Sequence, residues 1–388
     1  MAFALALLPT CDGQEDEKAE PLPLRTVIVY MVADNNLDHF ALKDLNEMEQ
    51  GWSPALDGNL IAYVDRAEGA SPAHPVVYKI EHDTTATIAS PIKKVYAEHS
   101  AVSGEVMRRV LSDIISDYPA QSYGLALWSH GTAWLPAGVA SGGSKGGGQG
   151  GHALRPQSFG KDGDEAMSMA DLSRALPCRF DFIIFDACYM GAVEVAYELR
   201  SNADYIIASP TEVLSAGYPY QDIVGRLFDR QVDYAGVAHR FFQSYSALEG
   251  AMQSASASVV KTAELDSLAA SFRRLMGDTA HLRPVNSGEV QRFSASSDIP
   301  LFDLGSVVST ISTNAEAREE VNKKILSAVA FKEATEKFLD AFTITDFSGM
   351  SIFIPDTLTA SYHDFYTTHA WFSASGYGGY FSRLGFGR

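Results

Sequence analysis

Short, unbroken runs of apolar residues recur along this chain and constrain its fold more than any other feature. The clearest are residues 25–32 (RTVIVYMV), 123–128 (YGLALW) and 180–185 (FDFIIF). Runs of this kind, without polar alternation, are typical of strands buried on both faces. Amphipathic helical patterns lie between them, for example at residues 103–118. The alternation predicts an α/β fold with a mostly parallel central sheet and helices on both faces.

The other expected elements continue this alternation as far as about residue 250, after which helical patterns dominate. We expect further strands at 60–64, 76–80, 205–209, 257–260 and 351–354, and helices at 40–49, 168–176, 190–199, 265–276 and 315–342. We therefore divide the chain into three parts. A leader covers residues 1–24, a core covers 25–250 with a glycine-rich loop at about 138–163, and a C-terminal subdomain, 251–388, packs on the core.

The net charge of the chain limits the kinds of molecule that it is expected to bind. Lys and Arg number 30 and Asp and Glu 48, which gives a net charge of −18. An acidic excess of this size repels phosphate backbones, so we expect no nucleic-acid partner. It is compatible with cationic substrates. Three cysteines in 388 residues cannot build a disulfide framework.

We do not expect the N-terminal residues 1–24 to belong to the folded core. Residues 1–8 (MAFALALL) are apolar, Cys11 follows, and an acidic stretch comes next. This order resembles the end of a bacterial lipoprotein signal, although the basic region expected before the apolar run is missing. We expect lipidation at Cys11 and a place in the cell envelope, as an outer-membrane or surface lipoprotein, or secretion. The alternative is a frayed terminus with an incidental cysteine.

Two of the apolar strands end at reactive residues. Residues 123–128 run into Ser129-His130-Gly131, and residues 180–185 run into Asp186-Ala187-Cys188. Because the carboxyl ends of parallel strands meet at one edge of a sheet, His130 and Cys188 should share a crevice. An imidazole can activate a thiol as a nucleophile and later protonate a leaving amine. The backbone N–H groups of Gly131 and Cys188 could bind the oxyanion that forms. The pattern predicts nucleophilic acyl transfer.

Each of these residues also has a structural interpretation. A cysteine at a strand end is usually a small buried hydrophobe, which we expect of Cys178, and a single histidine is often only a hydrogen-bonded structural residue. The joint occurrence of His130 and Cys188 after matching buried strands favours the catalytic interpretation.

The same blocks carry a family resemblance. An apolar strand with His-Gly, a spacer, and an apolar strand with Ala-Cys resemble the peptidase clan of caspases, legumain, gingipains and clostripain, and most closely the clostripain family. The supporting segments are TVIVYMVADNNLD (26–38), LWSHGTAW (127–134), FDACYMGAVEVAYELR (185–200), ADYIIASPTE (203–212) and SGMSIFIP (348–355). The resemblance implies a caspase-like three-layer α/β/α sandwich and a cysteine endopeptidase, with Cys188 as nucleophile and His130 as general acid and base. It also implies protein or peptide substrates cleaved after Arg or Lys.

Asp186 matches the family position whose carboxylate receives the basic P1 side chain. Asp186 and Cys188 are two residues apart at one strand end, so alternation points both side chains the same way. A carboxylate in a pocket selects guanidinium or ammonium through charge-assisted hydrogen bonds. The alternative for Asp186 is a turn or helix cap. Glu212 is a weaker second carboxylate for this pocket, and a solvated loop acid is the competing interpretation.

The family is often made as an inactive single chain that cuts itself between the two catalytic strands. Here that interval holds the glycine-rich loop, and Lys145 is the basic residue at its centre. We predict self-cleavage after Lys145, giving two chains that stay together as a monomeric enzyme. A plain flexible linker is the alternative.

Two other classes of function stay open at this point. One is a catalytically silent caspase-like binding protein of the cell envelope, and the other is a carboxylate-based hydrolase such as a glycosidase. No zinc or calcium motif occurs in the sequence, so we expect no required cofactor or metal. Calcium enters only by analogy with clostripain.

Overall fold

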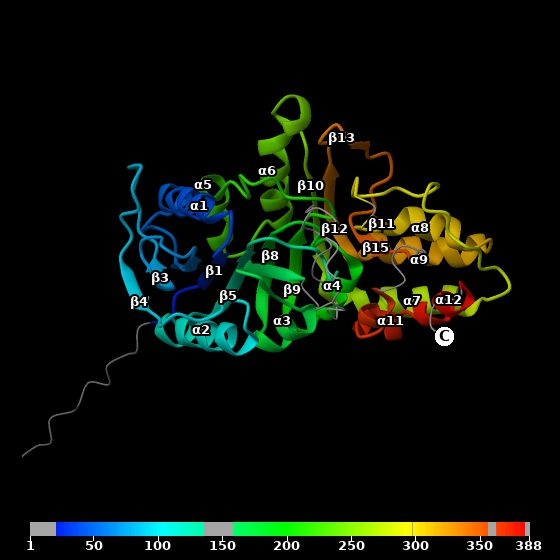
Figure 1. Cartoon of the computed structure of the whole chain (residues 1–388), viewed down its shortest axis with the longest axis horizontal. Coiled ribbons are helices and arrows are strands. Elements are labelled where there is room, and N and C mark those ends of the chain that lie inside the picture. Colours follow the sequence, from blue (N-terminus) through cyan, green and yellow to red (C-terminus); the bar gives the residue numbers. More distant parts are fainter. Residues whose placement is uncertain (1–20, 136–157, 297, 356–361, 385–388) are drawn as a thin grey trace, which may run out of the picture.

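The computed structural model describes residues 21–135, 158–296, 298–355 and 362–384 of the 388-residue chain. Within them, nine strands form one sheet in the order β12-β10-β9-β8-β5-β1-β2-β3-β4 (Figure 1). Strands β2, β1, β5, β8 and β9 run parallel, and antiparallel strands flank them on both sides. The nine strands are β1 (Arg25–Ala33), β2 (Gly58–Arg66), β3 (Val76–Lys79), β4 (Ile92–Val95), β5 (Ser122–Trp128), β8 (Phe180–Asp186), β9 (Ala203–Ala208), β10 (Ser256–Lys261) and β12 (Val329–Ala334).

Helices cover both faces of this sheet, so the predicted three-layer arrangement is confirmed (Figure 1). Along β1, Tyr30 and Val32 belong to one hydrophobic core, while Val29 and Met31 belong to the other. Side chains of a strand point alternately to opposite faces, and a parallel sheet with two covered faces therefore needs apolar residues at every position. One face carries α1 (Asp38–Gly51), α5 (Tyr220–Ile223), η1 (Val224–Phe228) and α6 (Tyr234–Ser246); the other carries α2 (Gly104–Asp117), α3 (Met169–Ala175), α4 (Val193–Glu198) and α7 (Leu265–Gly277).

The remaining described elements follow α6 along the chain, and they include the helices that pack beside α7 (Figure 1). They are η2 (Gly250–Met252), η3 (Thr262–Glu264), β11 (Leu301–Asp303), α8 (Leu304–Ile311), α9 (Ala315–Ala328), β13 (Lys337–Phe338), β14 (Phe342–Thr343), β15 (Ser351–Phe353), α10 (His363–Tyr366), α11 (Ala370–Ala374) and α12 (Tyr377–Arg383). Two further strands, β6 (Phe159–Asp162) and β7 (Glu165–Met167), form a hairpin next to the site described below.

The C-terminal part differs from the expectation in two ways. Strands β10 and β12 belong to the central sheet, so the sheet continues past the predicted boundary at residue 250. The helix predicted over 315–342 ends at Ala328, and the prediction is wrong beyond that residue. The reason is tertiary, because Val329–Ala334 pairs with β10 and the open edge of the sheet supplies hydrogen-bond partners that helical periodicity cannot reveal.

The hairpin and the fourth helix also depart from the sequence interpretation. Residues 159–162 fall inside the stretch predicted as a flexible loop, yet they form β6. The helix predicted over 190–199 begins only at Val193. Residues before it are held in an extended connection, because the N–H groups of Tyr189 and Gly191 donate to the carbonyls of Thr211 (2.8 Å) and Ser209 (2.9 Å).

None of the helices in the described ranges has the length and apolar content needed to cross a bilayer. The predicted lipidation site, Cys11, lies outside the described residues.

A buried carboxyl group joins the C-terminal part to the sheet. The side chain of Glu194 in α4 is fully buried. Its Oε1 accepts hydrogen bonds from the backbone N–H of Phe353 (3.0 Å) and from the hydroxyl of Tyr366 (2.8 Å). Burial raises the pKa of Glu194 to about 7, because the charged form is poorly solvated there.

This burial predicts a pH-dependent stability term. A raised pKa in the folded state gives a contribution that is present below the unfolded pKa of about 4.5 and is lost as the pH rises through about 7. Glu194→Gln keeps an acceptor oxygen but cannot ionise. We compare the free energies of unfolding of the variant and the wild type, measured with urea, at pH 4.5 and at pH 8. The difference, variant minus wild type, should be about 3 kcal/mol more positive at pH 8 than at pH 4.5.

Glu198→Gln is the matched control, because Glu198 lies on the same helix and accepts a hydrogen bond from the N–H of Ala370 at 3.1 Å. This control should keep the pH dependence of the wild type. An equal difference between Glu194→Gln and wild type at both pH values would contradict the assignment.

Candidate active site

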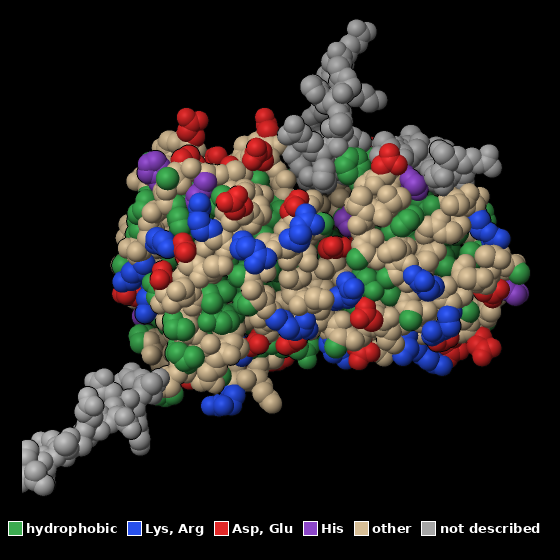
Figure 2. Space-filling view, turned by 90° about the horizontal axis from the view of Figure 1, so that it is seen from below, with side chains coloured by type: hydrophobic (Ala, Val, Ile, Leu, Met, Phe, Trp, Pro, Cys, Tyr) green, Lys and Arg blue, Asp and Glu red, His purple; other side chains and the backbone are tan. Residues whose placement is uncertain are grey.

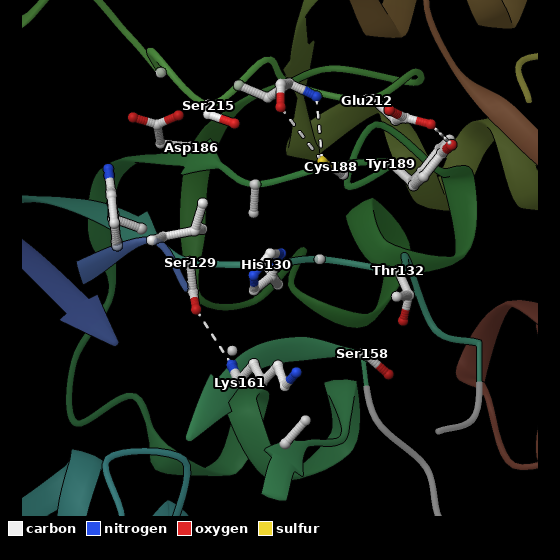
Figure 3. Close-up of a pocket in the computed structure, with 18 of the residues that line it drawn as sticks. Ser129, His130, Thr132, Ser158, Lys161, Asp186, Cys188, Tyr189, Glu212 and Ser215 are labelled. Atoms are coloured by element: carbon white, nitrogen blue, oxygen red, sulfur yellow. Dashed lines mark hydrogen bonds between the residues drawn. The ribbon is translucent and has the colours of Figure 1, made fainter. Parts of the chain in front are cut away.

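The carboxyl ends of β1, β5 and β8 open onto a cavity of about 690 Å³. Strand β1 pairs with β2 on one side and with β5 on the other, so the chain changes direction across the sheet at this point. Crevices at such reversals are where open α/β sheets bind ligands. His130 and Cys188 both line the cavity, and Figure 3 shows their side chains entering it from the ends of two neighbouring strands. The structure therefore brings the predicted pair together.

The turn that carries His130 is tied down on three sides. The hydroxyl of Ser129 donates to the carbonyl of Val32 (2.8 Å), and it accepts from the N–H of Lys161 (3.2 Å; Figure 3). The N–H of Ser129 donates to the carbonyl of Asp186 (3.3 Å). These bonds join the ends of β1, β6 and β8 around the histidine, so His130 stands on a rigid base.

The imidazole of His130 has one partner in the described chain. Its Nε2 lies 2.8 Å from Oδ1 of Asn36. Burial lowers the pKa of His130 below its usual value, and the positive charge of Lys161 lowers it further. The neutral imidazole is therefore favoured near pH 7, and this is the form that can accept a proton.

The thiol of Cys188 lies against the backbone of Val213. The N–H of Val213 donates to Sγ at 3.3 Å, and the carbonyl oxygen of Val213 is 3.5 Å from Sγ (Figure 3). Burial, together with the nearby carboxylate of Glu212, raises the pKa of Cys188 to about 12. The resting thiol is therefore protonated, and attack on a carbonyl requires a base.

The residue after the cysteine has an uncommon backbone conformation. Tyr189 has a φ of 65°, in the left-handed region that non-glycine residues seldom adopt. Its hydroxyl donates to Glu212 at 2.6 Å and lies 3.4 Å from the hydroxyl of Ser294. These contacts hold the turn that places Cys188 at the cavity wall.

Gly131 lies where the turns that carry His130 and Cys188 meet. A Cβ atom at this position would come within 2.6 Å of the carbonyl oxygen of Cys188, so no larger residue fits without movement. Gly131 is paired with Phe159 of β6 in an antiparallel β-bridge. The hydrogen bonds of this bridge are made by neighbouring residues: the N–H of Thr132 donates to the carbonyl of Ser158, and the N–H of Gly160 donates to the carbonyl of His130, both at 3.0 Å. The N–H of Gly131 takes no part in that bridge, which leaves it available to a ligand.

Asp186 forms a buried wall of the cavity and is only 5% exposed. Its Oδ2 accepts a hydrogen bond from the N–H of Tyr218 at 3.1 Å. Burial raises the pKa of Asp186 to about 7. Gly217, with a φ of 64°, passes so close that a Cβ atom there would lie 2.7 Å from Oδ2. Because Gly217 has no side chain to shield Oδ2 of Asp186, a cation that enters the cavity could pair with this oxygen.

Glu212 does not join Asp186. Figure 3 places the two carboxylates on opposite sides of Cys188, and Glu212 is engaged by Tyr189. Both residues line the cavity, but the two carboxylates predicted for one basic pocket do not meet. Lys145, the predicted cleavage site, lies outside the described residues.

The described ranges contain no group of three or more His, Cys, Asp or Glu side chains arranged to hold a metal ion. Calcium prefers several oxygen ligands, and the described side chains do not supply such a set. We therefore derive no catalytic step through calcium.

Three contacts of the site were missed by the sequence interpretation: the side chain of Asn36 and the backbones of Val213 and Tyr218. The two backbone groups leave no signal in the identity of their residues. Asn36 does leave one, because it follows the buried strand β1 just as His130 follows β5.

Comparisons with known proteins agree with this geometry. A profile of the clostripain family matches residues 29–377. Clostripain from Hathewaya histolytica is 30% identical over 235 residues, and the match covers 52% of this chain and only 42% of that protein.

Solved structures extend the likeness to the whole fold. An inactive zymogen C11 protease from Parabacteroides distasonis is 31% identical, with a TM-score of 0.78, over 92% of this chain and 99% of that one. A secreted C11 cysteine protease from Bacteroides thetaiotaomicron, in complex with an irreversible peptide inhibitor, is 29% identical, with a TM-score of 0.76 and the same coverage. The predicted caspase-like α/β fold is confirmed. Since the family profile spans most of the sequence, this chain belongs to the clostripain family of cysteine peptidases.

Proposed function

We propose that the protein is an endopeptidase that cleaves peptide bonds after Arg or Lys, with Cys188 as nucleophile and His130 as general acid and base. The observation that carries this proposal is that the thiol, the imidazole and the buried carboxyl of Asp186 line one cavity. A catalytically silent binding protein would not need a base beside the thiol. A glycosidase would need a pair of carboxyl groups facing each other, whereas Asp186 and Glu212 lie on opposite sides of Cys188 (Figure 3).

The reaction follows from the protonation states of the resting site. Neutral His130 takes the thiol proton as Sγ of Cys188 attacks the scissile carbonyl carbon, and the N–H groups of Gly131 and Cys188 bind the resulting oxyanion. The imidazolium then donates its proton to the leaving amine, the C–N bond breaks, and a thioester remains. His130 next deprotonates a water that attacks the thioester. The acid product leaves, and the proton returns to Sγ.

Specificity is supported by the position of Asp186. A guanidinium or ammonium group that enters beside Gly217 would meet a carboxyl oxygen in a poorly solvated place, where charge-assisted hydrogen bonds are strong. A cation there also stabilises the ionised carboxylate and lowers its pKa. A neutral P1 side chain would leave this carboxyl without a cationic partner.

A panel of peptides that differ only at P1 tests the specificity. Purified full-length protein should cleave the Arg and Lys peptides with a kcat/KM at least about 100-fold higher than the Leu and Gln peptides, because only the basic residues pair with Asp186. Equal cleavage of basic and neutral peptides would reject the pocket assignment. Absence of cleavage, together with no reaction of Cys188 with an arginyl or lysyl chloromethyl ketone, would favour the binding-protein alternative.

Activation is part of the proposal. We propose that the single chain cuts itself after Lys145 and that the halves stay associated. The support is threefold. Lys145 has the proposed P1 chemistry, its segment is rich in glycine, and the strands on either side of the cut, β5 and β8, are paired in the central sheet. One structural relative is an inactive zymogen.

Incubation of the purified chain tests this step. Mass spectrometry should find a new C-terminus at Lys145, and Lys145→Ala should abolish that cut. A Cys188→Ala chain that is still cut after Lys145 in purified form would show that the cleavage is not autocatalytic.

Export of the protein is the last part of the proposal. A structural relative is a secreted protease, and Cys11 stands after an apolar leader. We propose that the chain is exported as a monomer and carries a lipid at Cys11, which would be its membrane contact. Mass spectrometry of the protein from its native host should show a lipid mass that Cys11→Ser removes. An unmodified N-terminus would reject the anchor.

A further inference from the structure

The loop between β1 and α1 reaches the catalytic histidine. Residues 34–37 (DNNL) follow β1 directly, and β1 is the neighbour of the strand that carries His130. Oδ1 of Asn36 lies 2.8 Å from Nε2 of His130, and both residues line the cavity. No step of the proposed reaction uses this amide, so the contact calls for its own explanation.

The loop holds Asn36 firmly. The side-chain amide of the preceding residue, Asn35, donates to the carbonyl of Val32 at 3.0 Å and to that of Lys161 at 2.6 Å. Its oxygen accepts from the N–H of Leu37 at 2.9 Å, which closes a tight turn around Asn36. The same β6 strand that carries Lys161 also bonds to the backbone of His130, through Gly160. Both partners of the Asn36–His130 contact are thus mounted on one rigid frame.

The chemistry of the two groups assigns the proton. An amide oxygen only accepts hydrogen bonds, and a neutral imidazole carries a single N–H. A bond to Oδ1 therefore requires the proton on Nε2 and leaves the lone pair on Nδ1. Since the pKa of His130 is lowered, the neutral ring is the relevant resting form. In the described chain Nδ1 has no hydrogen-bond partner, so it is free to act as the base.

We infer that Asn36 is a positioning residue that keeps His130 in the Nε2–H tautomer and directs Nδ1 to the proton of Cys188. The bond also survives when Nδ1 becomes protonated, because the imidazolium still donates from Nε2. The inference rests on the proposed function for the role of His130, but the tautomer is a property of the resting protein and can be observed without turnover. Such partners of a catalytic or metal-binding imidazole commonly set which nitrogen carries the proton.

Nitrogen-15 NMR of histidine-labelled full-length protein reads the tautomer directly. His130 is assigned through a His130→Gln variant. In the wild type above the pKa of His130, we expect Nε2 to show the shift of a protonated nitrogen and Nδ1 that of an unprotonated one. In Asn36→Ala the two shifts should move toward each other as both tautomers become populated. A wild-type ring protonated on Nδ1, or an unchanged pattern in Asn36→Ala, would overturn the inference.

Kinetics supply a second readout. Asn36→Ala should lower kcat by about ten- to a hundredfold and change KM by less than about threefold, because positioned proton transfer contributes about 10²–10⁴. Asn36→Asp keeps an acceptor oxygen and should recover most of kcat. Its negative charge stabilises the imidazolium, so the acid limb of the kcat/KM profile should move to higher pH. Asn36→Ala with wild-type kcat, or Asn36→Asp with an unmoved acid limb, would count against the inference.

Asn59→Ala is the matched control. Asn59 also makes a side-chain hydrogen bond, here as a donor to the hydroxyl of Thr26 at 3.2 Å, but it lies near the start of β2, at the opposite end of the parallel strands. It should leave the tautomer, kcat and the acid limb unchanged. The two proposals also fail separately. Activity that persists in Cys188→Ala rejects the proposed function, whereas full activity in Asn36→Ala rejects only the inference.

Discussion

Replacement of Cys188 with alanine should lower kcat/KM for every cleavable peptide by at least about 10⁴-fold. The variant cannot form the thioester, because Cys188 supplies the only thiol among the described residues that line the cavity. The same variant should lose its covalent labelling by peptide chloromethyl ketones. His130→Ala should reduce the rate by about 10²–10⁴-fold, because a thiol whose pKa lies near 12 is barely ionised at neutral pH without a base.

Cys178 provides the matched control. Burial raises the pKa of this thiol as well, to about 11, so neither cysteine is intrinsically reactive. Of these two cysteines, Cys188 is the one that lines the described cavity together with His130. Cys178→Ala should therefore retain wild-type kcat/KM when it is assayed beside Cys188→Ala on one Arg substrate. Equal losses in both variants would mean that the assay reports folding, and retained activity in Cys188→Ala would remove the nucleophile assignment.

Asp186→Asn should have the second-largest effect, and only on basic substrates. The substitution removes the negative charge that would pair with the P1 cation, and it costs about 3–4 kcal/mol of substrate recognition. At about 1.4 kcal/mol for each factor of ten, kcat/KM for Arg and Lys peptides should fall by about 10²–10³-fold. Peptides with a neutral P1 residue should change by less than about threefold in the same assay.

Stability separates this result from misfolding. Asp186 has a raised pKa in the folded state, so its contribution to stability is lost as the pH rises through about 7. The amide oxygen of asparagine can still accept from the N–H of Tyr218. At pH 8, Asp186→Asn should therefore be no less stable than the wild type by urea unfolding. A variant that loses both stability and cleavage of all peptides would show that Asp186 serves the fold and not the pocket.

The distribution of charge on the surface also bears on the proposed specificity. Figure 2 shows acidic and basic side chains interspersed over the face that it presents, with no single-sign field on that face. The net charge of −18 is thus a weaker argument for a cationic substrate than the placement of one buried carboxyl. In the proposed function, selectivity for Arg and Lys rests on Asp186.

Local pattern predicted most of the central sheet and the placement of His130 and Cys188 at one edge of it. The apolar runs identified β1, β5 and β8 to within one or two residues, because strands buried on both faces are mostly apolar. The rule that carboxyl ends of parallel strands share an edge then brought His130 and Cys188 together. Applied to β1 as well, that rule would also have singled out Asn36.

The failures have a common cause. Residues 329–334 carry a pattern compatible with a helix, but they pair with β10 because that strand has an open edge. Asp186 is the last residue of β8, and Glu212 follows β9 in the same sheet. The connection after β9 nevertheless carries Glu212 to the far side of Cys188 (Figure 3). Neither outcome can be predicted from the local sequence, since each depends on contacts with segments that are distant along the chain.

What the amino-acid sequence determined by itself was the set of buried strands and the reactive residues placed at their ends, because burial on two faces and strand termination are local properties of the chain. What only the tertiary structure decided was the state of those residues. The neutral imidazole, the protonated thiol and the raised pKa of Asp186 arise from desolvation, and the partners Asn36, Val213 and Tyr218 come from segments remote in the chain. Solvation and through-space contacts depend on which groups lie close together in the folded molecule, and not on how far apart they are along the chain.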